Sequence, residues 1–186
     1  MSILKNRKIA TIIAAIAIVA ATMLGTTVSL NRASAKVEDM FYDGVYLENG
    51  GYMQPGIESH LEKRIEVSLG IWAIVDEYDE LKTELAAFRA ARESLINAGN
   101  PAQKGRGNDE LQLAFTVLRD ALAKIDLPER DVADLEKLFS TFNGAQTAIL
   151  GSGYNLEVME FMDGTLGAFP VVILKRFIPV RAPQLF

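Results

Sequence analysis

The stretch from residue 9 to residue 31 contains no charged side chain, and it follows directly on the basic residues Lys5, Arg7 and Lys8. Because a helix rises about 1.5 Å per residue, Ile9–Leu30 would form a helix about 33 Å long, which is enough to cross a hydrocarbon core of roughly 30 Å. A single segment of this kind excludes both a plain cytosolic globule and a polytopic membrane protein. The sequence therefore predicts a transmembrane anchor at residues 9–30 or, alternatively, the apolar part of a signal peptide.

The residues that follow leave the fate of this segment open. Ala33-Ser34-Ala35, followed by Lys36, has the small–any–small form of a signal-peptide cleavage site. Cleavage after Ala35 would give a secreted protein, whereas an uncut segment would be a single-pass anchor, which is the interpretation we favour. In both cases the basic N-terminal flank keeps residues 1–8 in the cytoplasm and the rest is exported. The predicted location is the cell membrane, with the C-terminal body extracytoplasmic.

The rest of the chain is acidic. All 24 acidic residues follow the charge-free stretch, and only 15 of the 19 basic residues lie beyond residue 35, which gives this body a net charge of −9. An acidic chain without a basic face is not expected to bind nucleic acid. The partners that we predict are therefore the membrane, through the first helix, and a protein that the sequence does not identify. The absence of cysteine excludes disulfides, Cys-ligated metal sites and a lipoprotein anchor.

Apolar residues in the body recur every three or four positions, which is the spacing of helices that bury one face. Val37, Phe41 and Val45 predict a short helical continuation of the anchor that ends at the turn cluster Glu48–Gly51. The longest stripe predicts a helix of about forty residues. Its members are Ile57, Leu61, Ile65, Leu69, Trp72, Val75, Tyr78, Leu81, Leu85, Phe88 and Leu95. Further stripes cover residues 111–125, 132–149 and 154–169.

Turn-forming residues separate these stripes. Asn97–Pro101 ends the long helix, and Gln103–Gly107 predicts a flexible loop, after which Asn108 is expected to cap the next helix. Leu127-Pro128 marks the next break, and no segment alternates apolar and polar residues over the length of a strand. The sequence therefore predicts an all-α fold, in which the N-terminal transmembrane helix is followed by an antiparallel three- to four-helix bundle with coiled-coil-like stripes over residues 36–186.

The side chains best suited to chemistry have simpler structural interpretations. His60, the single histidine, is expected on the polar face of a helix near its start. Glu58, Glu62 and Glu66 share one helix face, but without a Glu-x-x-His motif they are interpreted as a solvated face rather than as a di-metal site. Arg64, beside the apolar stripe, is expected to be partly buried in a structural ion pair with a carboxylate rather than to clamp a ligand.

The glycine pairs and the aromatic residues lead to the same conclusion. Lys104–Gly107 and Gly151–Gly153 contain Gly-x-Gly, but neither follows a predicted strand or has the spacing of a phosphate-binding loop. The aromatic residues on the stripes are expected in the core, namely Trp72, Phe139, Phe142, Phe161 and Phe169. We therefore predict no catalytic residue, no cofactor-binding residue, no metal ligand and no cofactor, and we do not expect an enzyme.

The segment Leu61–Arg64, followed by Val75 and Tyr78, resembles the Leu-x-Arg-Arg … Val-x-x-Tyr pattern of an early helix in the LemA family. It departs from that pattern in two places. Lys63 replaces an arginine, and Ser68–Ile71 stands where the family usually has Ile-Pro-Asn-Leu.

The later resemblance is the stronger one. Residues 154–170 have the spacing of the family's Tyr-Asn-x-x-Val-x-x-Phe … Phe-Pro signature, in Tyr154, Asn155, Val158, Phe161, Phe169 and Pro170. Pro183–Phe186 is similar to the family's Pro-x-Phe ending, and Leu138, Phe142 and Gln146 fit the helix that precedes the signature. From the residues themselves, we expect Asn155 to cap the backbone near Gly153 and Pro170 to turn the tail back across the bundle.

The resemblance covers residues 30–186 approximately, and it implies an N-terminal transmembrane segment and an antiparallel helical bundle, with no established enzyme activity, cofactor or catalytic residue. Together with the residue patterns, it predicts a membrane-anchored LemA-like protein of the bacterial cell envelope that acts as a non-enzymatic scaffold or docking protein. The alternative is an exported bundle that binds a small ligand or a peptide in a groove between helices.

Overall fold

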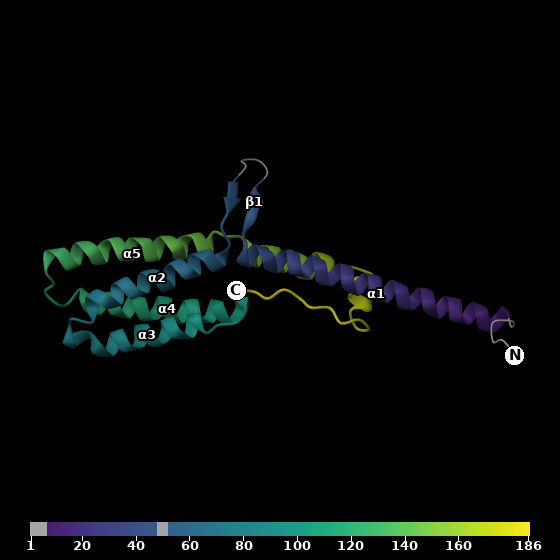
Figure 1. Cartoon of the computed structure of the whole chain (residues 1–186), viewed down its shortest axis with the longest axis horizontal. Helices are drawn as coiled ribbons and strands as arrows, with labels where there is room; N and C mark the ends of the chain where they lie inside the picture. The colour runs from purple at the N-terminus through teal and green to yellow at the C-terminus, as the bar shows by residue number, and fades with distance from the viewer. Residues whose placement is uncertain (1–6, 48–51) are drawn as a thin grey trace. The chain divides into compact units, whose positions relative to one another are not determined.

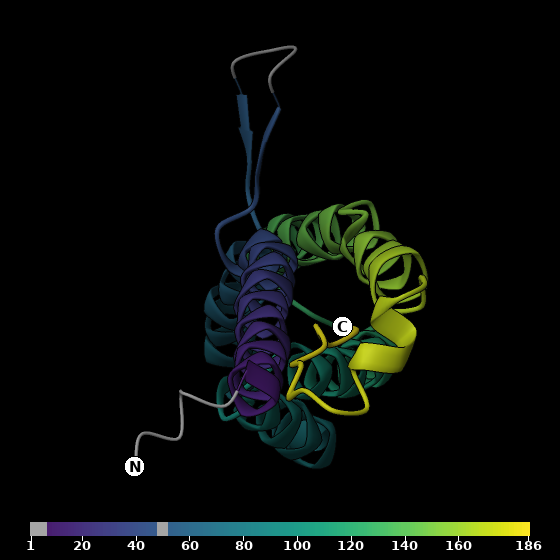
Figure 2. The same cartoon turned by 90° about the vertical axis from the view of Figure 1, so that its right-hand side faces the viewer.

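The computed structural model describes residues 7–47 and 52–186, most of them in helices (Figures 1 and 2). The predicted turn cluster Glu48–Gly51 and the basic residue Lys5 lie outside the described residues. Contacts divide the chain into two compact units. The bundle unit comprises Asp39–Leu156 with Gln184–Phe186, and the α1 unit comprises the residues up to Glu38 with Glu157–Pro183. The predicted body, residues 36–186, is thus shared between the two units.

Four helices form the core of the bundle unit. They are α2 (Ile57–Val75), α3 (Lys82–Ile96), α4 (Pro101–Leu122) and α5 (Glu129–Leu150). α2 packs against α5 and α3, and α3 packs against α4. Consecutive helices run in alternating directions along the bundle (Figure 1). The predicted all-α fold with an antiparallel helix bundle is confirmed, and the bundle has four helices.

A short β-hairpin, which the sequence pattern does not predict, precedes the bundle. β1 (Val45–Leu47) pairs antiparallel with β2 (Tyr52–Gln54), and Val45 lies opposite Gln54. Three residues per strand are too few to produce an alternating pattern, which explains why Val45 resembles the end of a helical stripe. Gly44 opens the hairpin with a φ of +85°, which glycine adopts most readily.

The buried face of α2 differs by one position from the predicted face. Its core positions are spaced alternately four and three residues apart, as in the heptad pattern of packed bundles. They are Ile57, Leu61, Arg64, Ser68, Ile71 and Val75, and Val67 is buried beside this face. Ile65 and Trp72 are only half buried and Leu69 is 43% exposed, so the assignment of these three residues to the core is wrong. Polar side chains occupy two of the six core positions, and the apolar pattern therefore shifts away from the true face.

The predicted forty-residue helix is divided into α2 and α3. The chain leaves the helical conformation at Tyr78, whose φ of −108° and ψ of 102° are extended, and a 3-10 turn at Asp79–Leu81 leads into α3. Val75 and Leu81 are both buried on either side of this turn. Because the apolar spacing continues across the turn, the sequence pattern does not reveal it.

Helix α4 begins seven residues before the predicted cap Asn108. The Asn100 side chain accepts a hydrogen bond from the Gln103 N–H at 3.0 Å, and Pro101 occupies the first turn. Gln103–Gly107 is therefore helical rather than a loop, and Asn108 lies buried inside the helix. Gly107 has a steric role, because a Cβ there would lie 2.8 Å from the Cα of Leu95 in α3.

Aromatic rings fill the centre of the bundle. The rings of Phe115 and Phe142 have centroids 4.3 Å apart, and Phe88 lies 6.3 Å from Phe142. Phe139 meets the edge of Phe115 at 5.2 Å. Phe142 is therefore a core residue as predicted, and Phe139 lies at the border of the same cluster.

The α1 unit holds most of α1 (Arg7–Tyr42) and α6 (Tyr154–Glu160), a π-helical turn (Phe161–Thr165) and α7 (Val171–Leu174). Its small core consists of Leu30, Phe161, Leu166 and Ile178. Phe161 is buried as predicted, whereas Phe169 is 80% exposed and its assignment to the core is wrong. The regular helix ends before Phe169, so helical spacing no longer determines the direction of this side chain.

Two glycines in helices test the closeness of the α3–α4 contact. At Gly107 a new Cβ would press on the backbone of α3, whereas at Gly144 in α5 it would meet nothing within 4 Å. Replacing a helical glycine with alanine stabilises by roughly 0.5–1 kcal/mol when there is space, but overpacking costs about 1–3 kcal/mol. In denaturant unfolding, we expect Gly107→Ala to lower the free energy of unfolding and Gly144→Ala to raise it. Equal stabilisation by both would contradict the tight α3–α4 packing.

Candidate functional site

Arg64 lies inside the bundle and is completely buried. It occupies a core position of α2, so the packing of α2 on its neighbours encloses the guanidinium. Its Cζ lies 4.0 Å from the centroid of the Phe142 ring in α5. Burying a charge costs several kcal/mol unless hydrogen bonds compensate for the lost water. The partners of this guanidinium are therefore central to how the helices pack.

Three side-chain amides accept hydrogen bonds from Arg64. Its Nη1 donates to Oδ1 of Asn108 and to Oε1 of Gln146 (2.5 Å), and its Nη2 donates to Oε1 of Gln112 (2.6 Å). Asn108 Nδ2 donates in turn to Gln146 Oε1 at 3.1 Å. We call Arg64 and these three residues the polar layer, and it joins α2, α4 and α5.

The predicted carboxylate partner of Arg64 is wrong. None of the ion pairs among the described residues includes Arg64. Burial lowers the pKa of Arg64 to about 10, and the negative charge of Asp109 offsets part of this effect. The side chain thus stays protonated at neutral pH, and its charge is stabilised by amide dipoles instead of by a paired carboxylate.

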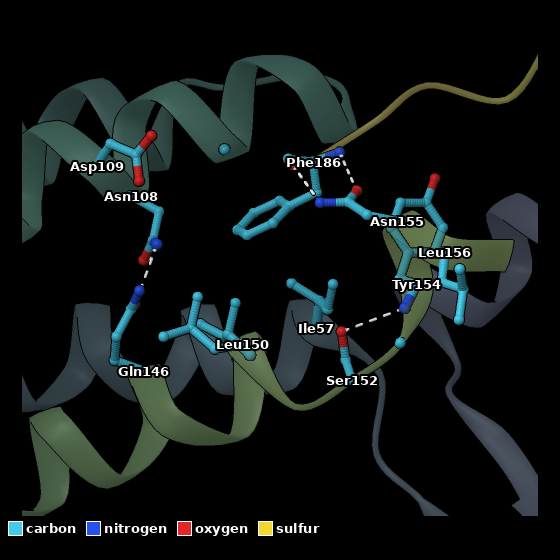
Figure 3. Close-up of a pocket in the computed structure, with 13 residues that line it drawn as sticks. Ile57, Asn108, Asp109, Gln146, Leu150, Ser152, Tyr154, Asn155, Leu156 and Phe186 are labelled. Carbon is cyan, nitrogen blue, oxygen red and sulfur yellow. Dashed lines mark hydrogen bonds between the residues drawn. The ribbon is translucent and has the colours of Figure 1, made fainter. Parts of the chain in front are cut away.

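A cavity of about 330 Å³ lies beside the polar layer (Figure 3). Asn108 and Gln146 lie at one end of it, and Ile57 and Leu150 contribute apolar wall. The other lining residues are Gly105, Asp109, Ile149, Ser152, Gly153, Tyr154, Asn155, Leu156 and Phe186. A volume of this size, with an apolar wall and a few converging polar groups, is typical of small-ligand sites.

A second hollow, of about 400 Å³, lies between the end of α4 and the start of α5. Its charged lining residues are Arg119, Asp126 and Glu136, and all three are exposed. It therefore lacks the buried polar groups that distinguish the cavity beside Arg64.

The C-terminal residues form one side of the cavity. Asn155 holds the main chain of Phe186 from both directions, because its Oδ1 accepts from the Phe186 N–H at 2.8 Å and its Nδ2 donates to the Phe186 carbonyl oxygen at 2.8 Å. The Tyr154 hydroxyl donates to the carbonyl oxygen of Gln184 at 2.7 Å. The expectation that Asn155 caps the backbone near Gly153 is therefore wrong. The expected return of the tail to the bundle is correct for Gln184–Phe186.

Gly105 permits this close approach of the tail. A Cβ at Gly105 would lie 2.8 Å from the carbonyl carbon of Phe186. On the other side, the Phe186 ring has its centroid 5.6 Å from that of Phe41. The tail thus lies between α4 and the end of α1, within the bundle unit.

Several residues that carry the LemA resemblance meet at this site. Arg64 and Gln146 belong to the polar layer, and Tyr154, Asn155 and Phe186 line the cavity. Outside the site, the Tyr78 hydroxyl donates to Oδ2 of Asp131 at 2.5 Å. This hydrogen bond is the main reason why the pKa of Tyr78 is raised to about 12.

The other candidate residues do not line the cavity. His60 is half buried in the first turns of α2. Glu62 and Glu66 are exposed, as predicted for a solvated face, and Glu66 pairs with Lys63 at 2.8 Å. Glu58 is half buried and forms an ion pair with Lys104 of α4. Within residues 7–47 and 52–186, no three His, Asp or Glu side chains are grouped to hold a metal ion.

Asn108, Gln112 and Gln146 are the site residues that the sequence reasoning did not connect with Arg64. The spacing of these residues from buried apolar residues on the same helices indicates that they face the core. Asn108 lies three residues before Leu111, and Gln146 lies four residues after Phe142, so both continue buried helix faces. Polar residues at core positions on three helices are expected to meet, because an isolated buried polar group is costly.

The cavity lining combines polar and apolar groups. The amides of Asn108 and Gln146 lie at one end, Ile57 and Leu150 contribute apolar wall, and both amide atoms of Asn155 are hydrogen-bonded to the main chain of Phe186. A neutral ligand with an amide group and an apolar side chain would match this combination.

Removing the buried cation should reveal the cost of the unpaired amides. Arg64→Met keeps an unbranched apolar stem but removes the guanidinium, which leaves Asn108 Oδ1 and Gln112 Oε1 without their donor and Gln146 Oε1 with the Asn108 amide alone. We expect the free energy of unfolding to fall by roughly 2–4 kcal/mol. Arg89→Met is the matched control, because Arg89 is exposed and its guanidinium stacks on Trp72, and its loss should cost about 0.5–1 kcal/mol. Denaturant titration measures both, and a fully stable Arg64→Met protein would contradict this role.

The chain gives no significant match to a protein-family model, to a curated protein or to a solved structure.

Proposed function

We propose that this chain is a single-pass membrane protein of the bacterial cell envelope, similar to the LemA family, whose acidic bundle is displayed outside the cytoplasm as a non-enzymatic docking domain. The observation that carries the proposal is the exposure of α1. Every residue from 11 to 20 is exposed, and α1 is the one helix in the described part of the chain that is long and apolar enough to cross a membrane. Within the uncharged stretch of α1, the exposed large apolar residues are Ile9, Ile12, Ile13, Ile16, Ile18, Val19, Leu24 and Val28.

The charge distribution supports the orientation. Arg7 and Lys8 are exposed at the start of α1, and the acidic residues all follow the apolar stretch. Basic residues are retained on the cytoplasmic side of a membrane, so the bundle belongs on the opposite side. There, the turn after α2 presents four exposed acidic residues, Asp76, Glu77, Asp79 and Glu80. A partner with a basic surface would complement this charge.

Membrane retention and chain size test the anchor. We expect the protein to remain in the membrane pellet after alkaline extraction and to keep its full mass of 20.4 kDa. A signal peptide cleaved after Ala35 would instead leave a chain smaller by about 3–4 kDa. Ala35→Leu is the matched control, because Ala35 is exposed and a large side chain there blocks cleavage. A wild-type chain that is soluble and smaller than the Ala35→Leu chain would contradict the anchor.

The cavity supports a second candidate function, the binding of a small ligand or peptide. The supporting observation is the pair of hydrogen bonds between Asn155 and the main chain of Phe186, at the wall of the cavity of about 330 Å³. The Asn155 side chain bonds both main-chain groups of Phe186, as it would those of a bound peptide. A separate peptide-like molecule in the cavity would lie against the side-chain amides and the apolar wall.

N-acetyl-phenylalanine amide is a suitable probe of this second candidate. We expect it to raise the melting temperature of the wild type, because ligand binding stabilises the folded state. Leu150→Trp places a bulky ring at the cavity wall and should abolish the shift, whereas Leu113→Trp, at an exposed position of α4 away from the cavity, should retain it. The measurement is the melting temperature of the three proteins with and without the probe. An equal shift in all three would argue against binding in this cavity.

A further inference from the structure

The tail of the α1 unit carries a second apolar surface that its own core does not use. Phe169, Val172, Ile173 and Phe177 are all exposed, and Phe177 is 69% exposed. We call these four residues the tail patch. Its neighbours Val171 and Leu174 pack inward on the core of the α1 unit. The segment is therefore apolar on its outer side as well as its inner side, which is unusual for a surface in contact with water.

The place of the tail along α1 follows from its contacts. The core cluster that includes Val171 and Leu174 also includes Met23, Leu30 and Ala33 of α1. Met23 and Leu30 belong to the second half of the uncharged stretch and lie about 10 Å apart along the helix axis. The segment that carries the tail patch, residues 169–177, thus lies beside the outer end of the span proposed to cross the membrane.

The contacts between α1 and the C-terminal part of the α1 unit change from apolar to polar after Leu30. Beyond Leu30, Asn31 accepts a hydrogen bond from the Arg181 N–H at 2.9 Å and donates to the carbonyl oxygen of Pro179 at 3.3 Å. About two turns further along α1, Glu38 forms an ion pair with Arg181 at 3.1 Å. This sequence of apolar, polar and charged contacts along one helix is the order of environments at the boundary of a bilayer.

We infer that the tail patch lies in the outer interface of the membrane that α1 crosses, and this inference rests on the proposed anchor. Surface segments of this kind bury their apolar side about 5–10 Å into the boundary between headgroups and acyl chains. Lys175 and Arg176 are exposed within the same segment. Their long side chains reach the phosphate groups while their stems remain in apolar surroundings. The occupant of the patch is thus phospholipid, with anionic headgroups favoured by the basic pair.

Tryptophan fluorescence in proteoliposomes tests the inference with the full chain. In a Trp72→Phe background, one tryptophan is placed in the patch (Phe177→Trp), in the middle of the proposed span (Ile16→Trp) or on the bundle (Leu113→Trp), all at exposed positions. The vesicles contain phosphatidylcholine and phosphatidylglycerol brominated near the headgroup or near the end of the acyl chains. We expect the indole at position 177 to lose roughly half of its emission or more to shallow bromines. The indole at position 16 should respond most to deep bromines, and the one at position 113 to neither.

The reporters distinguish the ways in which the inference and the anchor can fail. Quenching at position 16 without quenching at position 177 would overturn the tail patch and leave the anchor intact. Emission at position 177 that is blue-shifted but unquenched would assign the patch to a protein contact, such as a second copy of the chain. Absence of quenching at position 16 would overturn the anchor itself.

A charge-reversed variant tests the role of the basic pair. Lys175→Glu/Arg176→Glu should reduce the quenching at position 177 in vesicles with anionic lipid, because like charges repel the segment from the surface. Lys137→Glu, at an exposed position of α5, is the matched control and should leave the quenching unchanged. Equal quenching in both variants would overturn the preference for anionic headgroups.

Discussion

The buried guanidinium of Arg64 is the constraint on which the bundle unit depends. Burying a charge is costly unless hydrogen bonds replace the lost water. Here Asn108, Gln112 and Gln146, from two other helices, accept hydrogen bonds from Nη1 and Nη2, while Nε has no partner among the described residues. A shift of α4 or α5 by one residue would remove these partners. The polar layer therefore sets the register of three helices, as a single polar residue does at the core of a coiled coil. It also sets one end of the cavity, because Asn108 and Gln146 belong to both.

The sequence reveals the helices well and their ends less well. Leu111, Phe115, Leu118 and Leu122 are all buried, as their spacing predicts, because an apolar stripe on one helix has a single interpretation. The turn at Tyr78 escapes the pattern because the stripe continues through it. Gly105 and Gly107 suggest a loop, yet they serve close contacts with the tail and with α3. A glycine in a sequence is equally suited to a turn and to a tight contact, and only the packing distinguishes the two.

The candidate site is predictable in its parts and not in its assembly. Arg64, Tyr154 and Asn155 stand out in the sequence, and the expectation of a carboxylate partner for Arg64 follows from charge alone. The partners that the structure provides lie 44 to 82 residues away for Arg64 and 31 residues away for Asn155. Residues so far apart in the sequence are brought together only by the fold. The exposure of Phe169 has a similar origin, since the direction of a side chain beyond a helix end depends on the tail's course.

The two units support one proposal from different directions. The α1 unit contributes an apolar helix with a second apolar surface at its outer end, and the bundle unit contributes an acidic surface and a cavity bordered by the chain's own tail. The two apolar features of the α1 unit fit contact with a bilayer. The acidic surface and the cavity of the bundle unit fit contact with a partner or a ligand in water. An anchored docking protein unites these properties without requiring any reactive group.

The side of the membrane on which the bundle lies is the most direct test of this account. The chain has no cysteine, so Leu113→Cys, at a position that is 68% exposed, introduces a single accessible thiol. A membrane-impermeant maleimide applied to intact spheroplasts should label this thiol as completely as it does after lysis. Labelling that appears only after lysis would place the bundle in the cytoplasm and contradict the account.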